Sequence, residues 1–123
     1  MSTVCIGGDA ISIEPLILAR QACRALLDKK SGNVVLLDVR GASGVTDYYV
    51  VASGASAPQL KAMFNEVLHA LKEKGSLCYR RSGDPDSGWV VLDYVDVVIH
   101  ILSSEAREYY SIEDLWPGAP RLG

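Results

Sequence analysis

The alternation of apolar and polar residues predicts a β-hairpin near the C-terminal end of the chain. Two short runs rich in β-branched residues, 90–92 and 97–102, are separated by a polar step at 93–96 that suits a tight turn between antiparallel strands. Because side chains alternate along a strand, one face of the second run is purely aliphatic and must be buried. The opposite face carries a mixed set of side chains: Trp89, Val91, Asp93, Val98, His100 and Leu102. Such a mixture is poorly tolerated in a core and is typical of a binding surface.

Two longer helices are predicted in the first two thirds of the chain. Apolar residues at helical spacing indicate a helix over 15–30 and another over 56–75. The second has the clearer signal, because Ser56 and Gln59 form a Ser-x-x-Gln capping box before apolar positions at spacings of three and four. A short helix is predicted at 105–110, and Ser111 with Asp114 offers a weaker helix start.

The remaining pattern completes a sheet. Besides the hairpin, strands are predicted at 34–39, at 47–53 and, as an edge strand, at 77–81, with a polar turn at 82–88. This order of elements predicts a single-domain α/β fold with a mixed sheet of about five strands. We expect a flexible N-terminal arm at 1–13, the folded domain at 14–120 and a C-terminal tail at 121–123.

Composition narrows the class of protein. The chain has 123 residues, of which 49% are hydrophobic, enough for one domain with an ordinary core. Its net charge of -3 argues against a general nucleic-acid binder and favours a basic partner. Its three cysteines form no Cys-x-x-Cys pair, so we expect neither a disulfide framework nor a zinc site, and a reducing cytoplasm is the natural compartment. No export signal and no membrane-spanning segment is predicted.

The strand-to-helix junction at Gly54 to Ser56 is the first candidate for chemistry. Free backbone N–H groups and the helix dipole at such a junction can hold an anion, and the Gly-Ser pattern resembles the start of nucleotidyltransferases. Those enzymes follow it with carboxylates spaced two apart on a strand, which hold Mg²⁺. Here Asp93 and Asp96 are three apart across a turn, and Asp84 and Asp86 lie in a predicted loop. A plain helix cap is favoured, and a nucleotidyltransferase-like, nucleotide-binding enzyme is the alternative.

His100 and the hairpin aromatics are the second group of candidates. An imidazole between Ile99 and Ile101 could be a catalytic base, but no Gly-x-Ser-x-Gly sequence marks a nucleophile, so a structural or interface role is favoured. Trp89 and Tyr94 lie at the two ends of the first strand of the hairpin. The carboxylates at the turn predict that the end near Tyr94 is exposed to solvent. The aromatics are therefore read either as core residues or as anchors for a partner.

Several motifs in the same order resemble the ribosomal silencing factor (RsfS), or Iojap, family. They are Thr-Asp-Tyr-Tyr-Val-Val-Ala-Ser-Gly at 46–54, Gln-Leu-Lys-Ala at 59–62, the hairpin at 89–100, Arg-Glu-Tyr-Tyr at 107–110 and Leu-Trp at 115–116. The resemblance implies a nucleotidyltransferase-like fold without the catalytic carboxylates, no enzymatic activity and no cofactor. It also implies binding to the large ribosomal subunit through a uL-type protein at the intersubunit face. That binding would block subunit joining and repress translation under nutrient limitation.

The resemblance also suggests which residues make the contact. By matching positions these are Trp89, Asp93, Tyr94, Asp96 and His100, with Asp47 and Tyr48 as secondary contacts. The carboxylates would pair with Arg or Lys of the ribosomal protein, and the aromatics would anchor it. A homodimer through the sheet face or edge would compete with this binding. The chain departs from the family at Val95, where glycine is usual, and at Ser82, where glutamate is usual.

Overall fold

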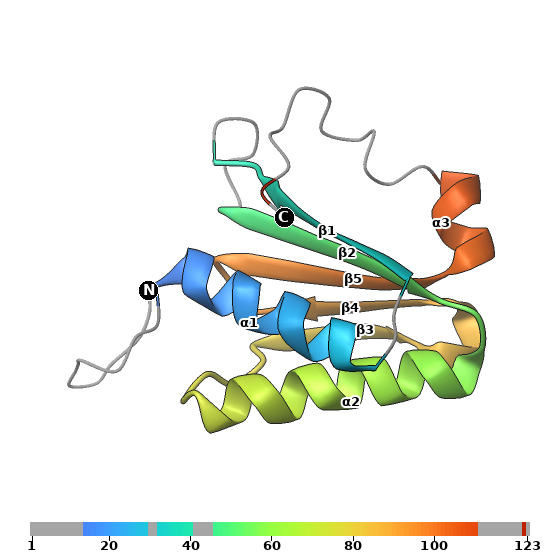
Figure 1. The fold of residues 1–123 in the computed structure, drawn as a ribbon, viewed down its shortest axis with the longest axis horizontal. Helices are drawn as coiled ribbons and strands as arrows, with labels where there is room; N and C mark the ends of the chain where they lie inside the picture. The colour runs from blue at the N-terminus through green and yellow to red at the C-terminus, as the bar shows by residue number, and fades with distance from the viewer. Residues whose placement is uncertain (1–13, 30–31, 41–45, 111–121, 123) are drawn as a thin grey trace.

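Five strands form one mixed sheet, and two helices cover the same face of it (Figure 1). This computed structural model describes residues 14–29, 32–40, 46–110 and 122. Their elements, in chain order, are α1 (Pro15–Asp28), β1 (Gly32–Asp38), β2 (Tyr48–Gly54), α2 (Ala57–Glu73), β3 (Arg80–Asp84), the 3-10 helix η1 (Pro85–Ser87), β4 (Trp89–Asp93), β5 (Val97–Ser103) and α3 (Ser104–Tyr110). The predicted α/β class and mixed five-stranded sheet are confirmed.

The strands are arranged in the order β1-β2-β5-β4-β3. β2 runs parallel to β5, whereas the other neighbours are antiparallel. The start of β2, the start of β5, the end of β4 and the start of β3 therefore lie at one end of the sheet. We call this end the carboxylate end, because Asp47, Asp93 and Asp96 lie there.

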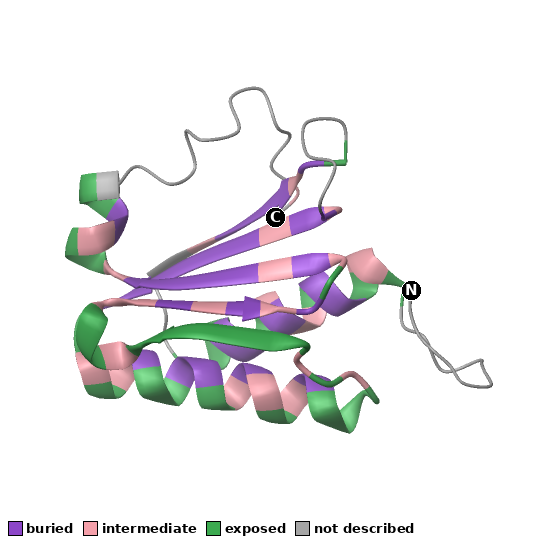
Figure 2. Ribbon diagram, turned by 180° about the vertical axis from the view of Figure 1, so that it is seen from behind, coloured by how far each residue is buried: buried purple, intermediate pink, exposed green. Residues whose placement is uncertain are grey.

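The core lies between the sheet and the helices α1 and α2. Val97, Ile99 and Ile101, the predicted aliphatic face of the hairpin, have no exposed surface and pack with Leu60 and Met63 of α2. Figure 2 shows buried positions along the inner strands and exposed ones along β3. On α1 the buried residues are Leu18, Ala19, Ala22, Ala25 and Leu26.

Local sequence explains the ends of α2. The Ser56 hydroxyl accepts a hydrogen bond from the Gln59 N–H at 3.3 Å, and the Gln59 side-chain oxygen accepts one from the Ala55 N–H at 2.7 Å. Two of the N–H groups at the helix start are thus satisfied. At the other end Gly75 adopts a left-handed φ of +87°, as expected for a residue that terminates a helix. The predicted capping box is confirmed. Its second hydrogen bond comes from the N–H group of Ala55, whereas a standard capping box would use the N–H group of Ser56.

The predictions for the third strand and for one helix face are wrong in detail. The strand expected at 77–81 is β3, and residues 82–84, expected in a turn, pair with Val91, Val90 and Trp89. Every residue of β3 is exposed, so no alternation of apolar side chains could have revealed it. Leu27, one of the apolar residues whose helical spacing predicts the first helix, is 59% exposed and does not lie on its buried face.

Gly83 explains how so polar a strand keeps its register. Its φ is +77°, and a Cβ there would lie 2.1 Å from the carbonyl oxygen of Trp89. Only glycine permits this approach of β3 to β4.

Some predictions fall outside the described residues: the arm at 1–13, the tail at 121 and 123, and the helix start at Ser111 and Asp114. Within the described part of the chain, no helix has both the length and the apolar character needed to span a membrane.

Candidate partner-binding surface

Trp89, Asp93 and His100 lie on the sheet face opposite α1 and α2. The pairing of β4 with β5 places Trp89 opposite Leu102, Val91 opposite His100 and Asp93 opposite Val98, as the alternation predicted. Trp89, Val91, Asp93 and Val98 are half-buried, whereas His100 and Leu102 are buried. This face therefore keeps accessible aromatic, aliphatic and carboxylate groups beside one another.

A cluster of three aromatic rings crosses this face diagonally. The Trp89 indole N–H donates a hydrogen bond to Nδ1 of His100 at 3.2 Å, and the ring centroid of Tyr49 lies 5.3 Å from that of His100. Because Nδ1 accepts a hydrogen bond, the imidazole is neutral in this arrangement. Burial lowers the pKa of His100 to about 4, which keeps it neutral near pH 7. The geometry gives His100 the role of orienting Trp89.

Tyr49 was not among the contact residues predicted from the sequence. It lies on the His100 face because it alternates with Tyr48, a signal that was present in the strand pattern. Burial, and then the negative charge of Asp93, raises the pKa of the Tyr49 phenol. Of the three rings, Tyr49 therefore lies nearest the carboxylate end, since Tyr49 and Asp93 both pair with Val98.

Tyr94 and Tyr48 are buried, so neither ring is available to anchor a partner protein. Tyr94 is 6% exposed and Tyr48 is 4% exposed, and both pack in the core on the helix-covered side. Burial raises the pKa of Tyr94. Tyr94 was predicted to be accessible because carboxylates flank it. The alternation from Val90 through Leu92, however, already assigns Tyr94 to the inner face. The prediction that these two aromatic rings are exposed contacts for a partner is therefore wrong.

Three carboxylates gather at the carboxylate end. The Asp96 carbonyl accepts hydrogen bonds from the N–H groups of Asp47 and Tyr48 at 3.0 and 3.1 Å, which ties the β4–β5 turn to the start of β2. Asp93 Oδ1 accepts the Val95 N–H at 2.7 Å. All three aspartates are partly exposed, and none forms a salt bridge with a cation among the described residues. The nearby Asp38, by contrast, binds Arg40 at 2.7 Å, which lowers the pKa of Asp38.

The Gly54 to Ser56 junction lies at the other end of β2 from these carboxylates. A strand of that length spans about 20 Å, so Asp93 and Asp96 cannot share a metal ion with a group at the junction. A Cβ on Gly54 would lie 3.0 Å from side-chain atoms of Leu60 and Met63, so close packing explains this glycine. The arrangement is that of a helix cap, as favoured from the sequence.

A sheet face that carries partly exposed aromatic rings and, at one end, three carboxylates without a salt bridge to any described residue is typical of a macromolecular interaction domain. Comparison with known proteins identifies the family. The family model described as "Ribosomal silencing factor during starvation" (RsfS) matches residues 12–122, and the chain belongs to this family.

Named relatives and a solved structure agree with this assignment. The ribosomal silencing factors RsfS of Halalkalibacterium halodurans and Bacillus subtilis are 35% and 34% identical over 105 residues, which cover 85% of this chain and 90% and 86% of those proteins. A solved protein of Chromobacterium violaceum has a TM-score of 0.82 at 35% identity, covering 86% of this chain and 88% of that one. The family name describes a regulatory role, so the prediction that the chain is not an enzyme is confirmed.

Proposed function

We propose that this protein binds the large ribosomal subunit in the cytoplasm and represses translation when nutrients are scarce. It does so by binding to a protein at the intersubunit face of the large subunit, so that the small subunit cannot join the large one. Membership of the RsfS family supports the ribosomal target. The observation that carries the mode of binding is the set of three carboxylates at one end of the sheet that form no salt bridge with any described residue.

The chemistry of these residues favours a basic protein as the direct contact. Asp47, Asp93 and Asp96 offer acceptors for Arg or Lys side chains, and charge-assisted hydrogen bonds of this kind give strength and orientation. Tyr49, which pairs with Val98 opposite Asp93, is the aromatic ring nearest these carboxylates, whereas Trp89, held by His100, lies at the other end of β4. RNA phosphates would be repelled by the same carboxylates. Silencing then needs only steric occupancy and no chemical step.

The test is co-sedimentation of the protein with isolated large and small subunits. We expect binding to the large subunit alone, and at least a tenfold weaker Kd for the double variant Asp47→Asn/Asp96→Asn. These changes preserve shape, and the hydrogen bonds that link the two residues use main-chain atoms. The matched control is Asp86→Asn in η1, an exposed aspartate remote from the carboxylate end. Equal binding by the wild type and the double variant would contradict the proposed mode of binding.

A further inference from the structure

Three exposed apolar side chains border the carboxylate end, and no sequence motif singled them out. Leu77 is 71% exposed, Tyr79 is 66% exposed and Val95 is 47% exposed. We propose that these residues, the sheet-end patch, extend the docking surface and take an apolar, basic-rimmed surface of the ribosomal partner protein. This inference rests on the proposed function and adds the apolar part of the contact.

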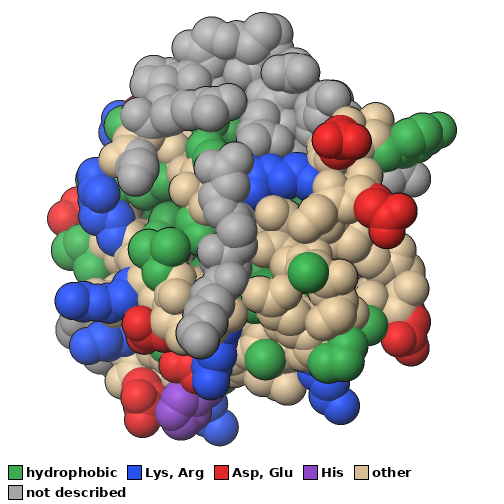
Figure 3. Space-filling model, turned by 45° about the vertical axis from the view of Figure 1, so that its right-hand side comes forward, with side chains coloured by type: hydrophobic (Ala, Val, Ile, Leu, Met, Phe, Trp, Pro, Cys, Tyr) green, Lys and Arg blue, Asp and Glu red, His purple; other side chains and the backbone are tan. Residues whose placement is uncertain are grey.

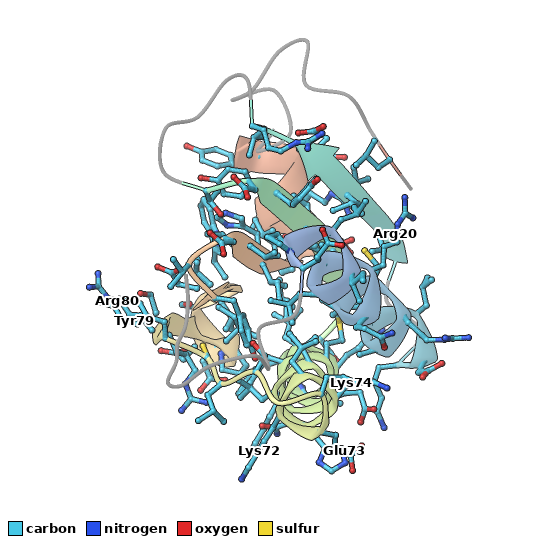
Figure 4. The ribbon with its side chains drawn as sticks, turned by 90° about the vertical axis from the view of Figure 1, so that its left-hand side faces the viewer. Arg20, Lys72, Glu73, Lys74, Tyr79 and Arg80 are labelled. Atoms are coloured by element: carbon cyan, nitrogen blue, oxygen red, sulfur yellow. The ribbon has the colours of Figure 1, made fainter. Side chains whose placement is uncertain are left out.

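Cys78 lies between Leu77 and Tyr79 in the chain, and its side chain points towards the core. Its thiol donates to the carbonyl oxygens of Arg80 at 3.2 Å and Asp93 at 3.7 Å, and its side chain packs against the core. Leu77 and Tyr79, on either side of this half-buried thiol, are both largely exposed, so their side chains face solvent. Figure 4 shows Tyr79 and Arg80 together at the margin of the molecule, apart from Lys72 and Glu73 at the end of α2.

The patch adjoins the carboxylates through main-chain contacts. The Tyr79 N–H donates to the carbonyl oxygen of Asp93 at 2.8 Å, and Arg80 pairs with Asp93 across the β3–β4 ladder. Val95 lies between Asp93 and Asp96 and is fixed by the Asp93 side chain. Tyr79 and Val95 are thus both joined directly to Asp93, on either side of it, at this end of the sheet.

The charges around the patch select the kind of partner. Asp47, Asp93 and Asp96 at this end form no salt bridge among the described residues, and the guanidinium of Arg80 lies over the Tyr79 ring at 5.6 Å from its centroid. Protein interfaces combine an apolar centre with a charged rim. A protein surface with an apolar residue ringed by Arg or Lys complements this arrangement, whereas a nucleic acid does not.

Other exposed apolar residues do not form a comparable surface. Ile17 and Leu27 stand about 15 Å apart along α1, and Tyr109 lies on α3 at the opposite end of the sheet. At that end, brought forward in Figure 3, hydrophobic side chains are separated from one another by backbone and charged groups. These positions therefore serve as controls.

The test compares Leu77→Ala/Tyr79→Ala with wild type for binding to isolated large subunits. We expect at least a tenfold weaker Kd with an unchanged melting temperature, because both side chains are exposed. Tyr109→Ala, the same change at an exposed tyrosine, should bind as wild type does. Val95→Asn, which suits a left-handed φ, provides an independent variant and should also weaken binding.

The outcomes separate the two proposals. If the wild type does not bind large subunits, the proposed function fails. If the wild type binds and Asp47→Asn/Asp96→Asn weakens binding while both patch variants bind normally, the docking mode stands and the sheet-end patch is overturned. A further outcome is that the patch variants lose concentration-dependent self-association while their ribosome binding is unchanged. That result would show that the patch binds a second copy of this chain, and it would also overturn the inference.

Discussion

At the residue scale, Val95 is the position where the residue type does not suit the backbone conformation. Its φ is +72°, the only left-handed value among the described non-glycine residues, and a β-branched side chain is strained there. The turn nevertheless forms, because Asp93 Oδ1 binds the Val95 N–H and the Tyr94 N–H donates to the Val97 carbonyl at 2.8 Å. The resemblance to the RsfS family had already indicated that glycine is usual here.

We therefore expect Val95→Gly to stabilise the fold by about 1 kcal/mol, because relief of strain outweighs the added freedom of the unfolded chain. Urea unfolding measures the difference. Val98→Gly in β5, where φ is not left-handed, should instead be destabilising and serves as the control. A lower midpoint for Val95→Gly would show that the valine is not strained.

His100 makes stability depend on pH. Its pKa is about 4 in the folded chain and near 6.5 when unfolded, so the unfolded chain binds the proton first as pH falls. The stabilisation is fully present above pH 6.5 and is lost as pH falls from 6.5 towards 4. From pH 7.5 to 5 we expect a loss on the order of 2 kcal/mol in the free energy of unfolding.

The variant His100→Asn isolates this contribution. An asparagine oxygen can still accept the Trp89 indole N–H but does not titrate. Urea unfolding at both pH values should show a smaller loss for the variant than for the wild type. The same loss in both proteins would remove His100 as the cause.

At the scale of elements, predictions were accurate where side-chain burial follows a period. α2 and the hairpin of β4 and β5 were predicted closely because their apolar residues repeat every 3.6 or every two positions. β3 was misplaced because its five residues are all exposed and its position depends on main-chain pairing with β4. Tyr94 was misassigned although the strand that precedes it, β4, carries the period that places it inside.

The α2 cap should contribute to stability without contributing to binding. We expect Ser56→Ala to lower the free energy of unfolding by about 1 kcal/mol, because one helix N–H loses its acceptor. Ribosome co-sedimentation of the folded variant should equal that of wild type, since the cap lies at the opposite end of β2 from the carboxylates. Weaker binding by this variant would place the contact surface elsewhere.

At the scale of the whole molecule, the candidate surface depends on topology that no local pattern contains. Asp47 precedes β2, and Asp93 and Asp96 flank the turn before β5, so they become neighbours only because β2 and β5 are parallel. The sequence predicted the residue types and the strands but not this pairing. It also did not indicate that Leu77 and Tyr79 would border the same end, because β3 had been placed three residues too early.

The parallel pairing of β2 with β5 also determines when the protein can act. Tyr48 and Val97 pair although they are about 50 residues apart, and closing so long a loop is slow compared with forming a hairpin. α2, β3 and β4 are all synthesised between these two strands. A chain still emerging from a ribosome would thus lack the assembled acidic surface, so the binding proposed above would require a chain in which β5 has already been synthesised.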